Sequence, residues 1–176
     1  MNFTDAFAKL IDPQHEGGLS MNPDDPGNWT GGQKGVGTLK GTKFGISAAS
    51  YPGEDIQNLS VDRAAFLYQR DFWGPAGCDA VPDVLKFDLF DAAVNTSAPG
   101  KCTTAIKMLQ HAVGVVEDGI LGPKTLLAIQ STPPERLLFR FDAARLVYYS
   151  EIHSDDLWLR FGRGWIRRVA TNMMGV

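Results

Sequence analysis

Cysteine and histidine are scarce in this sequence, with two and three residues among 176. Two cysteines exclude a disulfide-stapled small domain; they leave either one bridge between Cys78 and Cys102 or, as we expect, two reduced thiols. The histidines and cysteines lack the His-x-x-x-His and Cys-x-x-Cys spacings that are typical of zinc sites. No glycine-rich segment ends in the Gly-Lys-Ser/Thr of a phosphate-binding loop. We therefore expect no metal and no cofactor.

Long apolar runs are also missing. No run approaches the roughly 18 to 20 residues that span a bilayer, so we expect no membrane insertion. The first twelve residues lack the basic start and the apolar stretch of about 7 to 15 residues that form a signal peptide. We therefore expect a protein made in the cytoplasm.

Charge is modest overall but uneven along the chain. The net charge is −3, with 7 basic and 13 acidic side chains in residues 1–100 against 10 and 7 in residues 101–176. The C-terminal end carries Arg160, Arg163, Arg167 and Arg168, which either face an anionic polymer or form a solvated helix face. An isoelectric point near 5.5, with no recognised binding motif, argues against a nucleic-acid partner.

The composition fits one globular unit that is mostly helical. Hydrophobic residues make up 44% and charged residues 21%, enough to bury a core. Thr4 is the expected cap of the first helix, in which Pro13 predicts a kink, and Gly74-Pro75 predicts a break. The pattern predicts helices over 4–16, 60–73, 84–95, 101–113, 124–129, 134–152 and 164–173. The buried face of the longest is expected to hold Leu137, Phe141, Ala144, Tyr148 and Ile152.

One segment breaks this helical pattern. Nine of the nineteen glycines lie between Gly17 and Gly45, which predicts irregular backbone or a β-hairpin over 17–47. Any strands should be confined to it, so the expected fold class is all-α or α-dominated. A long glycine-rich loop in a small domain is typical of a functional segment.

Carboxylates at this loop suggest chemistry. Glu16 stands at its entrance, where the negative end of a helix dipole and partial burial would raise its pKa, as suits a general acid. Asp24 and Asp25 follow in a polar turn that favours the ionised form. Two carboxyls in different environments are what glycoside hydrolysis needs. The alternatives are an ordinary Asp-Pro turn and a solvated glutamate.

A family resemblance rests on several motifs in order. They are Glu16-Gly-Gly18, Asn22-Pro-Asp-Asp-Pro-Gly27, Gly41-Thr-Lys-Phe-Gly-Ile-Ser47, Tyr68-Gln-Arg-Asp-Phe-Trp73, Asp91-Ala-Ala-Val-Asn95, Leu109-Gln-His-Ala-Val-Gly114, Glu117-Asp-Gly-Ile-Leu-Gly-Pro-Lys-Thr125 and Phe161-Gly-Arg-Gly-Trp165. Together they resemble the glycoside hydrolase family 108 muramidases over nearly the whole chain. The resemblance implies a lysozyme-like fold with a catalytic lobe over 1–80. Residues 81–176 would form a helical lobe similar to a peptidoglycan-binding module, with both lobes packed as one unit.

The resemblance also implies site residues. Phage lysozymes, to which the family is similar, use a glutamate, an aspartate after eight intervening residues and a threonine after five more. Glu16 and Asp25 have this spacing, which favours Asp25 over Asp24. Thr42 follows Asp25 only after sixteen intervening residues, because 28–40 looks like an insertion. Glu16 would be the general acid, Asp25 would stabilise the cationic sugar or act as base, and Thr42 would hold the attacking water.

The implied activity is hydrolysis of the β-1,4 bond between N-acetylmuramic acid and N-acetylglucosamine. We expect a phage-type endolysin, a monomer that acts in the periplasm on glycan strands and depends on a holin or a secretion system for access. Alternatives are a lytic transglycosylase and a non-catalytic peptidoglycan-binding or secretion-accessory protein.

Other residues are candidates for glycan contact. Trp29, Tyr51 and Trp73 could stack on sugar faces, although the place of Trp73 at the end of a helix favours a core role for it. Asn95 either binds an acetamido group or caps its helix. Residues 109–125 either bind glycan or only pack against the cleft.

Overall fold

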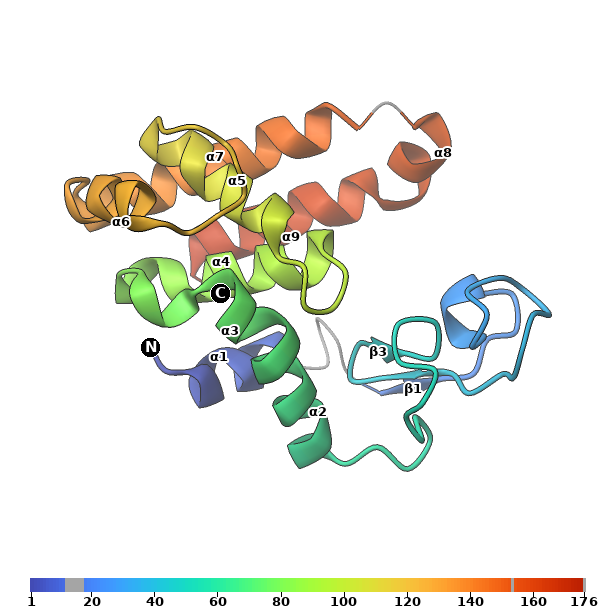
Figure 1. The fold of residues 1–176 in the computed structure, drawn as a ribbon. Coiled ribbons are helices and arrows are strands. Elements are labelled where there is room, and N and C mark those ends of the chain that lie inside the picture. Colours follow the sequence, from blue (N-terminus) through green and yellow to red (C-terminus); the bar gives the residue numbers. More distant parts are fainter. Residues whose placement is uncertain (12–17, 153, 176) are drawn as a thin grey trace.

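A computed structural model describes residues 1–11, 18–152 and 154–175, without the side chains of residues 156 and 160. Helices dominate, as the sequence predicts, and one small sheet stands apart from them (Figure 1). The longer helices are α1 (Phe3–Leu10), α2 (Val61–Tyr68), α4 (Asp83–Thr96), α5 (Thr103–Val113), α6 (Pro123–Gln130), α7 (Pro134–Ser150) and α9 (Arg163–Met174). Short turns of helix are α3 (Gly74–Ala76), α8 (Asp155–Leu157), two 3₁₀ segments (Pro26–Asn28 and Cys78–Ala80) and two π-helical segments (Gln69–Trp73 and Trp158–Gly162).

The first helix begins one residue earlier than predicted. Its cap is Asn2, whose Oδ1 accepts a hydrogen bond from the backbone N–H of Asp5 at 2.9 Å, so the Thr4 cap is wrong. A side-chain acceptor three residues before an unpaired N–H satisfies it equally well from Asn or Thr, and here the chain turns at Asn2. The kink predicted at Pro13 lies outside the described residues.

The break predicted at Gly74-Pro75 is also wrong. The chain stays helical through Ala76, because Gln69–Trp73 widens into a π turn in which the N–H of Gly74 donates to the carbonyl of Gln69. Pro75 then sits at the start of α3, where its missing N–H costs no hydrogen bond. The helix ends at Gly77, whose φ of +69° is the left-handed conformation that closes helices.

The predicted buried face of the longest helix is confirmed at its start. Leu137, Phe141 and Ala144 of α7 are buried, whereas Tyr148 is half-buried and Ile152 follows the end of the helix. The same helix buries a charged residue that the apolar pattern does not reveal, Arg145.

The sheet lies inside the glycine-rich segment, as predicted. Three antiparallel strands, β1 (Leu19–Ser20), β2 (Thr42–Lys43) and β3 (Ile46–Ser47), pair in chain order. The hairpin between β2 and β3 turns on Phe44 and Gly45, both with positive φ. This two-residue turn matches the twist of its strands, and Tyr68 steadies it by donating its O–H to the Phe44 carbonyl at 2.8 Å.

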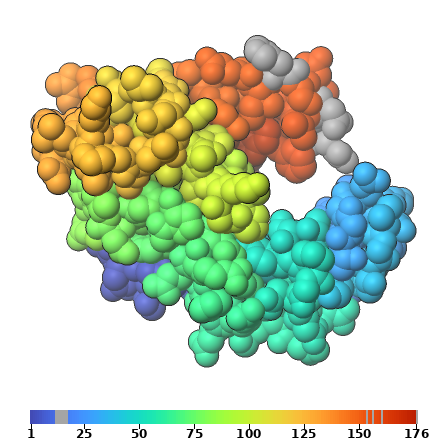
Figure 2. Space-filling model, in the orientation of Figure 1, coloured from blue at the N-terminus to red at the C-terminus, as the bar shows by residue number. Residues whose placement is uncertain are grey.

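One hydrophobic core connects the helices. It takes residues from α1, α2, α4, α5 and α7, so side chains from both sides of position 80 share it; the division into lobes at 80/81 stays a prediction. Cys78 and Cys102 are both buried and free, as expected. In Figure 2 a hollow separates the lobe that contains the sheet from the C-terminal helices.

Candidate functional site

Glu16, the predicted acid, lies outside the described residues. The segment that follows it is described: β1 begins at Leu19 and pairs with β2 so that Ser20 lies opposite Thr42. The strand that carries Thr42 therefore lies beside the strand that follows Glu16 in the chain.

The insertion at 28–40 does not carry Thr42 away from the carboxylate segment. Its two ends meet at one atom, the carbonyl oxygen of Asn28, which accepts from the N–H groups of Lys40 and Gly41 at 3.0 and 3.1 Å. Gly41 has φ +86°, and a Cβ there would lie 2.6 Å from the Ser20 carbonyl oxygen. Only glycine at position 41 allows the end of the insertion to lie so close to β1.

Asn28 also fixes the Thr42 side chain. The Thr42 hydroxyl donates to Asn28 Oδ1 at 2.7 Å, and Asn28 Nδ2 donates to the Asn22 carbonyl at 2.9 Å. Asn28 is fully buried, so these bonds are shielded from water. Because its proton is committed, the hydroxyl of half-buried Thr42 is left to accept. The sequence did not single out Asn28, because nothing in the pattern of a glycine-rich loop marks one asparagine as functional.

The two neighbouring aspartates have different surroundings. Asp25 Oδ1 accepts from the N–H of Gly27 at 2.8 Å and so caps the 3₁₀ turn, while Oδ2 has no partner among the described residues. Asp24 forms an ion pair with Lys34 instead. Both side chains are exposed, but Asp24 is paired with a lysine, whereas Asp25 has no ion-pair partner among the described residues.

The two tryptophans proposed for sugar stacking, Trp29 and Trp73, differ in exposure. Trp29 is half-buried in the loop, where its indole N–H donates to the Pro23 carbonyl at 2.9 Å and fixes the ring. Trp73 is only 1% exposed and packs edge-on against Phe3 and Phe90. Its burial leaves no ring face for a sugar, so the structure favours the core role for Trp73.

Tyr51 is 9% exposed, and its hydroxyl donates to Asp71 Oδ2 at 2.8 Å. Burial, and then the bond to Asp71, raise the pKa of Tyr51 well above its usual range. Arg70 pairs with Asp71 and lowers the pKa of that carboxyl. The ring of Tyr51 lines a small pocket of about 90 Å³ together with Ser97.

Asn95 does not cap its helix. α4 runs on to Thr96, and Asn95 Nδ2 donates to the hydroxyl of Tyr149 in α7 at 2.8 Å. It lines a pocket of about 340 Å³, hereafter the Asn95 pocket, whose other walls include Tyr148, Tyr149 and Trp165. Ser97 lines both this pocket and the one at Tyr51, so the two adjoin.

A buried ionic network lies beneath the Asn95 pocket. Asp91 accepts from Arg145 Nη2 at 2.6 Å, from Arg168 Nε at 2.7 Å and from Asn172 Nδ2 at 3.1 Å. Burial would raise the pKa of Asp91, but the two guanidinium groups outweigh it and hold the pKa below its usual value. The network ties α4, α7 and α9 together.

Three members of this network, Asp91, Arg145 and Arg168, stand one helical turn from a wall of the pocket. Asn95 follows Asp91 by four residues, Tyr149 follows Arg145 by four, and Trp165 precedes Arg168 by three. Residues at these spacings share a helix face, so the network sets the position of the pocket walls. Tyr149 and Trp165 stack, with ring centroids 5.3 Å apart.

The basic C-terminal residues divide into two kinds. Arg168 belongs to the buried network, which agrees with neither reading of the sequence. Arg163 and Arg167 are exposed and lie beside Trp158 in a surface hollow. The side chain of Arg160 lies outside the described residues.

The 109–125 motif is largely occupied by its own loop. Gln110, 1% exposed, donates through Nε2 to Asp118 at 2.7 Å and to Thr125 at 3.2 Å, and accepts from the N–H of Gly119 at 2.8 Å. These residues therefore shape the loop and leave few polar atoms for a glycan.

In the described part of the chain, no helix combines the length and apolarity needed to cross a membrane. The same residues contain no cluster of three or more His, Cys, Asp or Glu side chains that could hold a metal ion.

Comparison with known proteins identifies two domains. Residues 13–96 match the family model Glycosyl hydrolase 108, and residues 104–170 match the Predicted Peptidoglycan domain. The solved structure of Brucella abortus SagA is 28% identical and superimposes with a TM-score of 0.75 over 97% of this chain and 90% of that chain. No curated protein sequence matches significantly. The chain therefore combines a glycosyl hydrolase 108 domain over residues 13–96 with a peptidoglycan domain after it.

Proposed function

We propose that this protein, a peptidoglycan hydrolase by its two domains, cleaves the β-1,4 bond between N-acetylmuramic acid and N-acetylglucosamine. The pairing of Ser20 with Thr42 supports this most directly. It joins the strand that follows Glu16 to a threonine whose hydroxyl is fixed by a buried asparagine. An acid and a fixed water acceptor are two of the parts that hydrolysis of an acetal requires.

In this mechanism Glu16 protonates the leaving oxygen. Thr42 accepts a hydrogen bond from the attacking water and positions it, because its own O–H already donates to Asn28. Asp25, with Oδ2 free, stabilises the positive charge that develops on the sugar or takes the proton of the water. Asp24 is held by Lys34 and takes no part.

The glycan would lie in the hollow of Figure 2 and continue along the adjoining pockets at Tyr51 and Asn95. Asn95 Oδ1 would accept the N–H of an acetamido group, since Nδ2 donates to Tyr149. Trp165 would offer an apolar face to a sugar ring. The walls of the Asn95 pocket come from both matched domains, which gives the second domain a part in substrate binding.

Mass spectrometry of fragments released from purified sacculi tests the proposal. Hydrolysis of this bond leaves reducing N-acetylmuramic acid, whereas a lytic transglycosylase leaves a 1,6-anhydro end. Glu16→Gln should release fragments at less than about a tenth of the normal rate, because an amide cannot deliver the proton. Asp24→Asn is the matched control and should keep its rate. Reducing N-acetylglucosamine ends would contradict the choice of bond, and no release by the unaltered protein would favour a non-catalytic binding protein.

A role as a phage-type endolysin that reaches the periplasm through a holin or a secretion system, and acts as a monomer, stays a prediction.

A further inference from the structure

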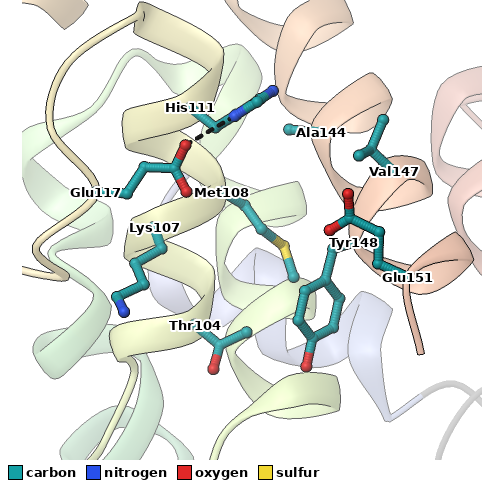
Figure 3. A pocket seen from close by; sticks show the side chains of 9 residues that line it. All are labelled: Thr104, Lys107, Met108, His111, Glu117, Ala144, Val147, Tyr148 and Glu151. Atoms are coloured by element: carbon teal, nitrogen blue, oxygen red, sulfur yellow. Dashed lines mark hydrogen bonds and ion pairs between the residues drawn. The ribbon is translucent and has the colours of Figure 1, made fainter. Parts of the chain in front are cut away.

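Another pocket lies inside the peptidoglycan domain, between α5 and α7 (Figure 3). It encloses about 480 Å³, which is the size of a site for a small molecule or a short peptide. Lys107 and His111 come from α5, Glu117 from the following loop, and Tyr148 and Glu151 from α7. We call it the α5/α7 pocket.

The pocket carries unpaired charge of both signs. Figure 3 shows Lys107 on the α5 side and Glu151 on the α7 side. Neither side chain has an ion-pair partner among the residues that the structure describes. Glu117, by contrast, is held by His111, with its Oε1 2.8 Å from Nδ1. One cation and one carboxylate are thus left to meet a ligand.

Part of the surface between these charges is apolar. Met108 and Ala144 line the pocket and are only 4% and 5% exposed. A neutral sugar has no charged groups that could pair with a cation and a carboxylate on either side of an aliphatic surface. A ligand with an ammonium group and a carboxylate on a short aliphatic chain satisfies all three features.

The position of the pocket points to the source of such a ligand. Tyr148 lines both the α5/α7 pocket and the Asn95 pocket, so the two adjoin. In peptidoglycan a peptide branches from the lactyl group of N-acetylmuramic acid, and in many bacteria it contains a zwitterionic diamino acid. A glycan strand in the Asn95 pocket would direct that branch past Tyr148.

We propose that the α5/α7 pocket binds the stem peptide of peptidoglycan, with a carboxylate of its diamino acid at Lys107 and the free ammonium at Glu151. This inference rests on the proposed function for the orientation of the strand. The peptidoglycan domain of the chain would then recognise the peptide part of the substrate as well as its glycan.

Binding is measured apart from catalysis by titrating the protein calorimetrically with the tripeptide L-Ala-γ-D-Glu-meso-diaminopimelate. The double variant Lys107→Gln with Glu151→Gln should bind about tenfold more weakly, because two solvent-accessible ion pairs together contribute about this factor. Glu135→Gln with Arg136→Gln is the matched control, since both side chains are exposed on α7 outside the pocket. No binding by the unaltered protein, or equal affinity in both double variants, overturns the proposal.

Cleavage provides the second readout. Intact sacculi are compared with glycan strands stripped of peptide by an amidase. The Lys107/Glu151 double variant should lose rate on sacculi by several-fold and match the unaltered protein on stripped strands. Equal loss on both substrates would assign these residues to the glycan or to folding and would refute peptide recognition. If the unaltered protein cleaves neither substrate, the proposed function fails, while the titration still decides whether the pocket binds the peptide.

Discussion

Replacement of Arg145 by methionine should be among the most damaging single changes in the described fold. Arg145 is fully buried and lies 2.6 Å from Asp91, with Asp88 and Asp142 at 3.4 and 3.7 Å. Methionine fills similar space but removes the charge. Asp91 would then be left in the interior with Arg168 as its remaining cation.

The loss of stability can be estimated from the buried carboxylates that lose their guanidinium partner. Removing one partner of a buried ion pair costs about 3–5 kcal/mol of unfolding free energy. In a chain of this size each kcal/mol lowers the melting temperature by about 2–4 °C, so Arg145→Met should melt about 6–20 °C lower. Circular dichroism at neutral pH measures this directly.

Two further variants make the result specific. Arg140→Met lies on the same helix but is exposed, and should leave the melting temperature nearly unchanged. Adding Asp88→Asn to Arg145→Met neutralises a buried carboxylate whose ion-pair partner was Arg145 and should restore part of the lost stability. A melting temperature for Arg145→Met within about 2 °C of the unaltered protein would refute the reasoning, since loss of one partner of a buried ion pair should lower the unfolding free energy by much more than this.

Three other predictions concern single groups. Burial raises the pKa of Asp142 to about 7, so the folded state holds its proton and the unfolding free energy should fall as pH rises from about 4 to about 7. Asp142→Asn should flatten that slope in denaturant titrations, and an unchanged slope would contradict the assignment. Asp25→Asn should slow release of fragments from sacculi by more than about tenfold, whereas Asp24→Asn should change it less than about twofold, and equal losses would rule out the role of Asp25. Burial also raises the pKa of Cys78, and that of Cys102 to about 11, so a thiol reagent at pH 8 should label both only after unfolding; rapid labelling of the native protein would show that the thiols are accessible.

Helical structure could be predicted because it depends on local pattern. Apolar residues at helical spacing located the main helices, and glycine density located the sheet. The errors fell at the ends of elements. Pro75 was read as a break, but a π turn before it lets the helix continue, and no propensity distinguishes these outcomes. Thr4 and Asn2 are equally good helix caps, and the backbone conformation at Asn2 makes that residue the cap.

Part of the candidate site could be proposed from the sequence. The motifs pointed to Asp25 over Asp24, and the structure gives the two carboxylates different partners. The place of Thr42 could not be read from its spacing. An insertion can extend in any direction, and here both of its ends bond to the carbonyl of Asn28, which returns the chain to β1.

By itself the sequence determined the helical class, the small sheet in the glycine-rich segment and the motifs of a glycosyl hydrolase, because each depends on residues close together in the chain. The tertiary structure alone decided that Asn95 meets Tyr149, that Arg145 and Arg168 converge on Asp91, and that Tyr148 joins two pockets. The three hydrogen bonds each join residues more than fifty positions apart in the sequence. Their meeting depends on how α4, α7 and α9 pack, and packing is fixed by the whole core and not by any local preference.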